Sequence, residues 1–229
     1  STPARPEVVE AMLPWLAEHP GNPSGSHRLA REARRAIDDA RDAVAALIDA
    51  DPGDVVFTSG GTEADNLAVD GVLGARGGVA VCGATEHPAV LDPVRLSGGV
   101  VVPTDVGGRI DLGALVDALD AIADVRLVSV MAANNETGVV NPVPEVAALV
   151  AEHAPEALVH TDAVQATAWL DLSDACRGAH LVSITGHKFG GPKGAGALVL
   201  RGGATVAPML RGGGQERERR SGTQNVPAI

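Results

Sequence analysis

Residues 181–200 read LVSITGHKFGGPKGAGALVL, in which two short apolar runs enclose a glycine-rich loop. Short runs rich in β-branched side chains and bounded by glycine are typical of buried strands. Similar runs recur along the chain. The sequence therefore predicts seven strands, at Val55–Thr58, Val79–Cys82, Val100–Pro103, Leu127–Met131, Leu158–Thr161, Leu181–Thr185 and Ala197–Leu200.

Segments of helical periodicity separate most of these runs, and another helix is expected directly after Ser1-Thr2-Pro3. Tyr is absent and aromatic residues make up 2% of the chain, so the core must consist of small aliphatic side chains, which suits parallel strands covered by helices. We expect one α/β domain over residues 1–229, a three-layer αβα arrangement with a mostly parallel seven-stranded sheet. The main predicted helices are Ser26–Ile48, Thr62–Ala75, Leu112–Ala123 and Val143–His153.

Charge and composition exclude several classes of function. The formal net charge of −11 argues against nucleic-acid binding, which needs clustered Lys and Arg. No apolar stretch approaches the length needed to cross a membrane, and two cysteines cannot form a disulfide framework. We therefore expect a cytoplasmic protein, and a local site for a small anionic ligand is compatible with its net charge.

The first predicted strand ends in TSGGTEADN, residues 58–66, a glycine turn that runs into a helix. Free backbone N–H groups at such a helix start, near Gly61, together with the Thr62 hydroxyl, can hold a phosphate group. An ordinary capped turn is the alternative, and for an isolated glycine pair it is the commoner one. The absence of Gly-Lys-Ser/Thr argues against a nucleoside triphosphatase.

Two later strands also end in reactive side chains. Lys188 follows the sixth strand beside Thr185 and His187, where a lysine can form a Schiff base with a carbonyl cofactor. Asp162 ends the fifth strand and could keep a pyridine nitrogen protonated, while Gln165 could bond the phenolic oxygen of such a ring. A solvated surface lysine and a helix N-cap aspartate are the alternatives.

His87 and Asn135 follow two further strands. A flat imidazole can stack on a pyridine ring, and an amide can bond the phenolic oxygen or a substrate, although single His and Asn residues usually serve packing or turns. Because these groups follow successive strands that are expected to end at one edge of the sheet, the set predicts a site for pyridoxal 5′-phosphate (PLP).

The sequence resembles the cysteine desulfurases, members of the class V aminotransferase group that supply sulfur to iron–sulfur cluster and nitrogen-fixation systems. The resemblance covers essentially the whole chain, and its most specific part is the glycine-rich string near the end. The matching segments are residues 21–24 with His27, 58–66, 86–87, 134–136, 162–165, 187–188, 191–194, 212–216 and 220–223.

The resemblance implies that Lys188 carries the cofactor as a Schiff base. It also implies that Asp162 pairs with the ring nitrogen and that His87 stacks on the ring. Gln165 and Asn135 would contact the phenolic oxygen and the substrate. By this resemblance, the catalytic residues of the family correspond to Lys188, His87 and Asp162.

The phosphate would be held, by the same resemblance, by Gly61, Thr62, Thr185 and His187. The family usually has Ser at the position of Thr185, which keeps the hydroxyl. Thr223 matches a threonine that reaches the phosphate of the neighbouring subunit in the family, which implies a homodimer with shared sites.

The implied reaction converts L-cysteine to L-alanine and passes the sulfur to a protein persulfide, for a sulfur-acceptor or scaffold protein. In the family, a cysteine on a mobile loop receives the sulfur, and we expect this loop and most of the small domain to be missing here. Cys82 and Cys176 match no such motif and are expected to be inert, so the chain alone should be inactive. The alternatives are a selenocysteine lyase or another carbon–sulfur lyase, a non-catalytic PLP-binding fragment and, more remotely, a nicotinamide-binding domain.

Overall fold

The computed structural model describes residues 1–229 and contains one sheet of seven strands. The strands are β1 (Val55–Thr58), β2 (Val79–Gly83), β3 (Val100–Val102), β4 (Val125–Ser129), β5 (Leu158–Asp162), β6 (Leu181–Thr185) and β7 (Gly196–Leu200). Their order across the sheet is β1-β7-β6-β5-β4-β2-β3. Each predicted strand is present, so the prediction of a seven-stranded sheet is confirmed.

Only β7 runs against the other strands, pairing antiparallel with both β1 and β6, while all other neighbouring strands are parallel. In these two pairings Gly196 lies opposite Thr58 and opposite Thr185. The ends of β1 and β6 and the start of β7 therefore meet at the edge where the parallel strands also end. The predicted mostly parallel sheet is confirmed.

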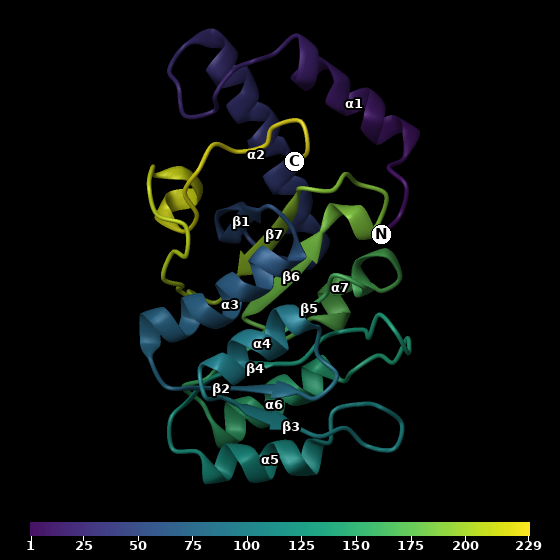
Figure 1. Cartoon of the computed structure of the whole chain (residues 1–229), viewed down its shortest axis with the longest axis vertical. Coiled ribbons are helices and arrows are strands. Elements are labelled where there is room, and N and C mark those ends of the chain that lie inside the picture. Colours follow the sequence, from purple (N-terminus) through teal and green to yellow (C-terminus); the bar gives the residue numbers. More distant parts are fainter.

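Helices cover both faces of the sheet, which confirms the predicted three-layer αβα architecture (Figure 1). Helices α3 and α4 pack on one face and α2, α5, α6 and α7 on the other. None of them combines the length and apolar character that crossing a membrane requires. The helices are α1 (Pro6–Ala17), α2 (Arg28–Ile48), α3 (Gly61–Arg76), α4 (Pro88–Leu96), α5 (Leu112–Ala121), α6 (Val143–His153) and α7 (Leu172–Ala175).

Small aliphatic side chains fill both interfaces between sheet and helices, as the composition predicts. Leu67 of α3 packs with Leu127 and Leu198 on one face, and Leu115 of α5 packs with Val128 on the other. Each such side chain, when fully buried, contributes about 1.5–3 kcal/mol relative to an exposed one. The two apolar layers hold the sheet rigid, so that the loops at its carboxyl edge start from fixed positions.

Most predicted element bounds differ from the structure by one or two residues, and three differences have a clear physical cause. Strand β4 begins at Val125 instead of Leu127 because Val125 pairs with Val79 of β2. Helix α2 begins two residues later than predicted because the His27 ring accepts a hydrogen bond from Ala30 N (3.3 Å) and caps the helix. Helix α4 was not among the main predicted helices, since its two prolines weaken the helical pattern.

Candidate functional site

A polar cavity of about 440 Å³ lies where the parallel strands end and α3 begins. Nine of the ten predicted site residues line it: Gly61, Thr62, His87, Asn135, Asp162, Gln165, Thr185, His187 and Lys188. The tenth, Thr223, is exposed and does not line this cavity. The fold thus brings together residues from five separate loops, and it leaves Thr223 outside them.

The turn between β1 and α3 is formed by a close approach of two backbones. A Cβ atom on Gly196 of β7 would lie 2.6 Å from the carbonyl carbon of Gly60, and one on Gly61 would lie 2.8 Å from Val164 Cγ2. Gly196 therefore has no room for a side chain, and a side chain at Gly61 would require Val164 to move. The first turn of α3 has backbone N–H groups without partners inside the helix, and the Thr62 side chain lies beside them at the cavity. This end of the cavity suits an anion.

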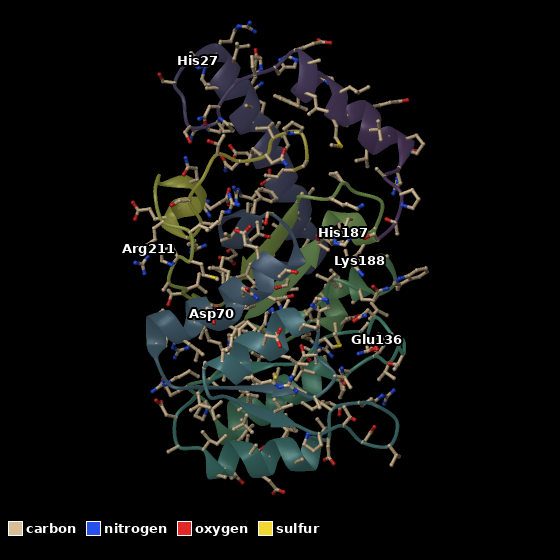
Figure 2. The ribbon with its side chains drawn as sticks, in the orientation of Figure 1. His27, Asp70, Glu136, His187, Lys188 and Arg211 are labelled. Carbon is tan, nitrogen blue, oxygen red and sulfur yellow. The ribbon has the colours of Figure 1, made fainter.

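Lys188 ends a short 3-10 turn, Gly186–Lys188, that follows β6 directly. Figure 2 shows His187 and Lys188 next to each other at this edge of the sheet. The N-terminal residues hold the turn, because Thr2 N donates to the His187 carbonyl (2.8 Å) and Ser1 Oγ lies 2.9 Å from His187 Nδ1. Burial, followed by the nearby charge of Lys188, lowers the pKa of His187. The Lys188 side chain is half-buried and lines the cavity.

Asp162 lies at the end of β5 with 6% of its surface exposed. Its Oδ1 accepts a hydrogen bond from Val164 N (2.8 Å). The helix N-cap alternative is wrong, because the next turn is a 3-10 turn whose cap is Gln165. Burial raises the pKa of Asp162, although the Val164 bond and the charges of His87 and Lys188 oppose this. A cation placed in the cavity would therefore stabilise the charged form of Asp162.

His87 and Asn135 reach the cavity from two neighbouring loops. His87 caps α4, since its Nδ1 accepts a hydrogen bond from Ala89 N (3.1 Å), and a neutral ring in this arrangement carries its proton on Nε2. Asn134 is the buried turn residue of its loop, with Oδ1 accepting from Glu136 N (2.9 Å). Its neighbour Asn135 is left exposed to the cavity.

The Thr185 hydroxyl donates to the Ala195 carbonyl (3.0 Å) and is buried. Its oxygen faces the β1–α3 turn, where a Cβ atom on Gly60 would be 3.9 Å away. To donate to a phosphate, the hydroxyl would have to turn away from Ala195.

Sequence reasoning missed a polar network beneath the cavity. The buried ring of His160 lies 2.8 Å from Ser129 Oγ and 2.9 Å from Ser183 Oγ, which joins β4, β5 and β6. Asp65 of α3 lies above it, with Oδ1 3.6 Å from His160 Nε2 and no hydrogen-bond partner. The signals were present in the sequence, since His160 and Asp162 share one face of a strand and Asp65 is one helical turn after Gly61.

The charge states of this network follow from burial. Burial lowers the pKa of His160 to about 3, so its ring is neutral near pH 7. Burial, followed by the charge of Asp162, raises the pKa of Asp65 well above its ordinary value. Two like charges in one dry site oppose each other, so we assign the proton to Asp65 and the charge to Asp162.

A second missed feature is an ion pair at the start of α3. Arg220 Nε donates to Glu63 Oε1 (2.7 Å), and Arg220 Nη2 donates to Oε2 (3.3 Å). Glu63 also accepts a hydrogen bond from Ser59 N (2.8 Å) and lines the cavity. The pair joins residues 157 positions apart, which periodicity and motif spacing cannot detect.

Neither cysteine lies at the cavity. Cys82 and Cys176 are both fully buried. Burial raises the pKa of the Cys82 thiol to about 12 and that of the Cys176 thiol to about 11. Both are therefore protonated near pH 7, and this agrees with the expectation of inert thiols.

The sequence matches the protein family described as Aminotransferase class-V over residues 1–229. Among curated relatives, it is 47% identical to a cysteine desulfurase of Rhodobacter capsulatus over 98% of this chain and 59% of the relative. It is 41% identical to cysteine desulfurase IscS of Dictyoglomus turgidum over 100% of this chain and 59% of the relative. The chain thus spans about three fifths of the length of the curated relatives it matches.

Solved structures show the same fold. A NifS-like protein superimposes with a TM-score of 0.94 at 36% identity, over 100% of this chain and 64% of the other. SspA in complex with cysteine superimposes with a TM-score of 0.91 at 33% identity, over 100% of this chain and 67% of the other.

Proposed function

The chain belongs to the class-V aminotransferase family, and on this premise we propose that its cavity binds PLP and that the protein is a cysteine desulfurase. Its substrate would be L-cysteine and its products L-alanine and a sulfur atom passed to a protein thiol. The observation that carries the proposal is the gathering of nine predicted site residues around one cavity. The names of the curated relatives favour this activity over that of other carbon–sulfur lyases.

The cavity residues fit the chemical groups of PLP. The start of α3, with Gly61 and Thr62, would hold the phosphate, and Lys188 would bind the aldehyde. The charged carboxylate of Asp162, buried and without a cation of its own in bonding contact, suits a protonated ring nitrogen. When bound, PLP supplies an electron sink for the negative charge that develops at the substrate Cα.

Side chains of the protein would transfer protons and fix the orientation of the reacting groups. Lys188 Nζ would be the amine that moves a proton at the substrate Cα. The Ala89 hydrogen bond fixes the orientation of the His87 ring over the cavity. Asp162 keeps its charge because Asp65 beside it holds the proton, so the negative charge stays at one defined carboxylate.

The sulfur acceptor would be a thiol other than Cys82 and Cys176, because both are buried and protonated near pH 7. Thr223 is exposed on the C-terminal segment, which leaves it free to reach the site of a second copy. We therefore retain a homodimer with shared sites, and a sulfur-acceptor or scaffold protein, as parts of the proposal.

The experiment that tests the proposal is PLP loading followed by borohydride reduction and peptide mapping. We expect a visible absorption band and cofactor mass on the peptide that holds Lys188. Lys188→Ala should abolish the covalent mass. Lys193→Ala is the matched control, because Lys193 also lines the cavity. Cofactor mass on Lys193, or on no peptide, would refute the proposed role of Lys188.

A further inference from the structure

The carboxylate of Glu63 lies where it would repel an anion bound at this site. It lies in the first turn of α3, the turn proposed to hold the cofactor phosphate, and its side chain lines the same cavity. Burial alone would raise the pKa of Glu63, but hydrogen bonds from Arg220 and Ser59 outweigh burial and lower it. The carboxylate is therefore ionised near pH 7, and its charge would repel a phosphate.

Arg220 is placed to remove this repulsion. Its guanidinium binds both carboxylate oxygens of Glu63, and the two side chains are only 18% and 17% exposed. Arg220 itself does not line the cavity, unlike the cations Lys188 and Lys193. Its influence on a ligand must therefore pass through Glu63.

The segment that carries Arg220 is firmly held. Glu216, a few residues earlier, is buried and accepts hydrogen bonds from Arg41 Nη1 (2.9 Å) and from Phe57 N (3.0 Å) of β1. Figure 1 shows this C-terminal segment, in yellow, running beside α2 and α3. Arg220 therefore starts from a backbone tied to the same strand that leads into the phosphate turn, which limits the entropy lost on pairing.

We propose that Arg220 is a positioning residue for the phosphate-binding turn, acting by neutralising Glu63 and holding its carboxylate toward Ser59 N. The inference rests on the proposed function, because it takes the phosphate of PLP as the anion. The remaining charge at the start of α3 is then the positive end of the helix dipole, which attracts the phosphate. With Glu63 neutralised in this way, the predicted phosphate residues Gly61 and Thr62 would act without an unpaired negative charge beside them.

The test compares Arg220→Gln, Glu63→Gln and the double variant for binding of PLP and of pyridoxal, which has the same ring and aldehyde but no phosphate. Arg220→Gln should weaken PLP binding roughly tenfold, the effect of about one partly screened unit charge, and leave pyridoxal binding unchanged. Glu63→Gln should bind PLP at least as tightly as the wild type. The double variant should recover wild-type affinity, because no unpaired charge remains.

Arg211→Gln is the matched control, since Arg211 is an exposed arginine on the same segment and projects away from the molecule (Figure 2). Thermal unfolding of each variant shows whether it is folded. If Arg220 merely anchored its segment, the double variant would bind PLP as weakly as Arg220→Gln. That result, or wild-type PLP affinity in Arg220→Gln, would overturn the inference.

Inorganic phosphate separates this inference from the proposed function. Phosphate should raise the melting temperature of the wild type and of the double variant more than that of Arg220→Gln. If phosphate behaves in this way while PLP never links to Lys188, the proposed function fails and the role of Arg220 stands. If neither phosphate nor PLP protects the wild type, both are overturned.

Discussion

Replacing Asp162 by Asn should make the ligand-free protein more stable and the loaded enzyme less active. The amide keeps the size of the side chain and can still accept the 2.8 Å hydrogen bond from Val164 N at Oδ1. Only the charge is removed. Because Asp162 is 6% exposed, this charge is costly in the absence of a cation and useful in its presence.

The sign of the stability change follows from the pKa. Burial raises the pKa of Asp162 in the folded state above its ordinary value of 3.8. The wild type therefore loses stability as the pH rises from 3.8 toward the folded pKa, and the loss is constant above that value. The charges of His87 and Lys188, which face the carboxylate, reduce the effect, and Asp65 adds no charge because it holds the proton. Asp162→Asn avoids this loss, so its advantage should grow over the same pH range.

The loss of turnover in Asp162→Asn follows from a different interaction, the hydrogen bond between the carboxylate and the protonated ring nitrogen. A hydrogen bond to a charged group contributes about 1.5–3 kcal/mol, so turnover should fall by about one to two powers of ten. PLP affinity should fall less, because the proposed phosphate contacts at the start of α3 would be unchanged. The assays are urea unfolding of the ligand-free protein between about pH 4 and about pH 8, and alanine formation from L-cysteine by the complete enzyme.

Asp117→Asn is the matched control, because Asp117 is exposed on α5. It should alter neither property. Equal unfolding free energies for Asp162→Asn and wild type across the pH range would refute the argument from burial. Unchanged turnover would refute the pairing of Asp162 with the ring nitrogen.

Three further outcomes are expected. Glu216→Ala leaves Arg41 buried without its carboxylate, so the free energy of unfolding in urea should fall by about 3–5 kcal/mol, and a loss below about 1 kcal/mol would contradict this. Gly196→Ala would place a Cβ atom 2.6 Å from the backbone of the β1–α3 turn, so melting temperature and PLP affinity should both fall; an unchanged affinity would show that the turn tolerates displacement. Cys82 and Cys176 should resist alkylation in the native protein and react after unfolding, and rapid native-state labelling would disprove their burial.

The sequence predicted the strands well because each is a short apolar run between glycine-rich or polar turns. It did not identify β7 as the reversed strand, although the loop from β6 to β7 holds only residues 186–195. A parallel crossover needs a dozen or more residues, so this short loop already requires an antiparallel pair. Helix α4 was missed for a different reason, since Pro93 inside it opposes helix propensity and packing of Val90 and Val94 against the sheet overrides that.

The site could be predicted to the extent that it depends on strand ends. Parallel strands bring their carboxyl ends to one edge of the sheet. The proximity of residues at or directly after strand ends, such as Asp162 and Lys188, can therefore be predicted without knowing how the side chains pack. Glu63 and Arg220 could not be paired in this way. Their contact depends on the path of a glycine-rich C-terminal segment that is fixed by Glu216, and no local pattern encodes that path.

The two carboxyl groups that the sequence did not identify, on Glu63 and Asp65, share one property. Each is neutralised through a residue that is distant in the sequence, which is why local patterns do not reveal it. Asp65 and Glu63 lie on α3 within the first turns after Gly61, where the sequence pointed only to Gly61 and Thr62 as phosphate-binding residues. Each is compensated by a group from elsewhere: Glu63 by the guanidinium of Arg220, and Asp65 by a proton that the charge of Asp162 helps to retain. Three carboxyl groups therefore face one cavity, yet only Asp162 is assigned a negative charge that no cation contacts directly. The cavity therefore has a negative charge at Asp162 and the positive end of a helix dipole at the start of α3. This arrangement favours a ligand that is cationic at one end and anionic at the other. PLP with a protonated ring nitrogen has this distribution of charge.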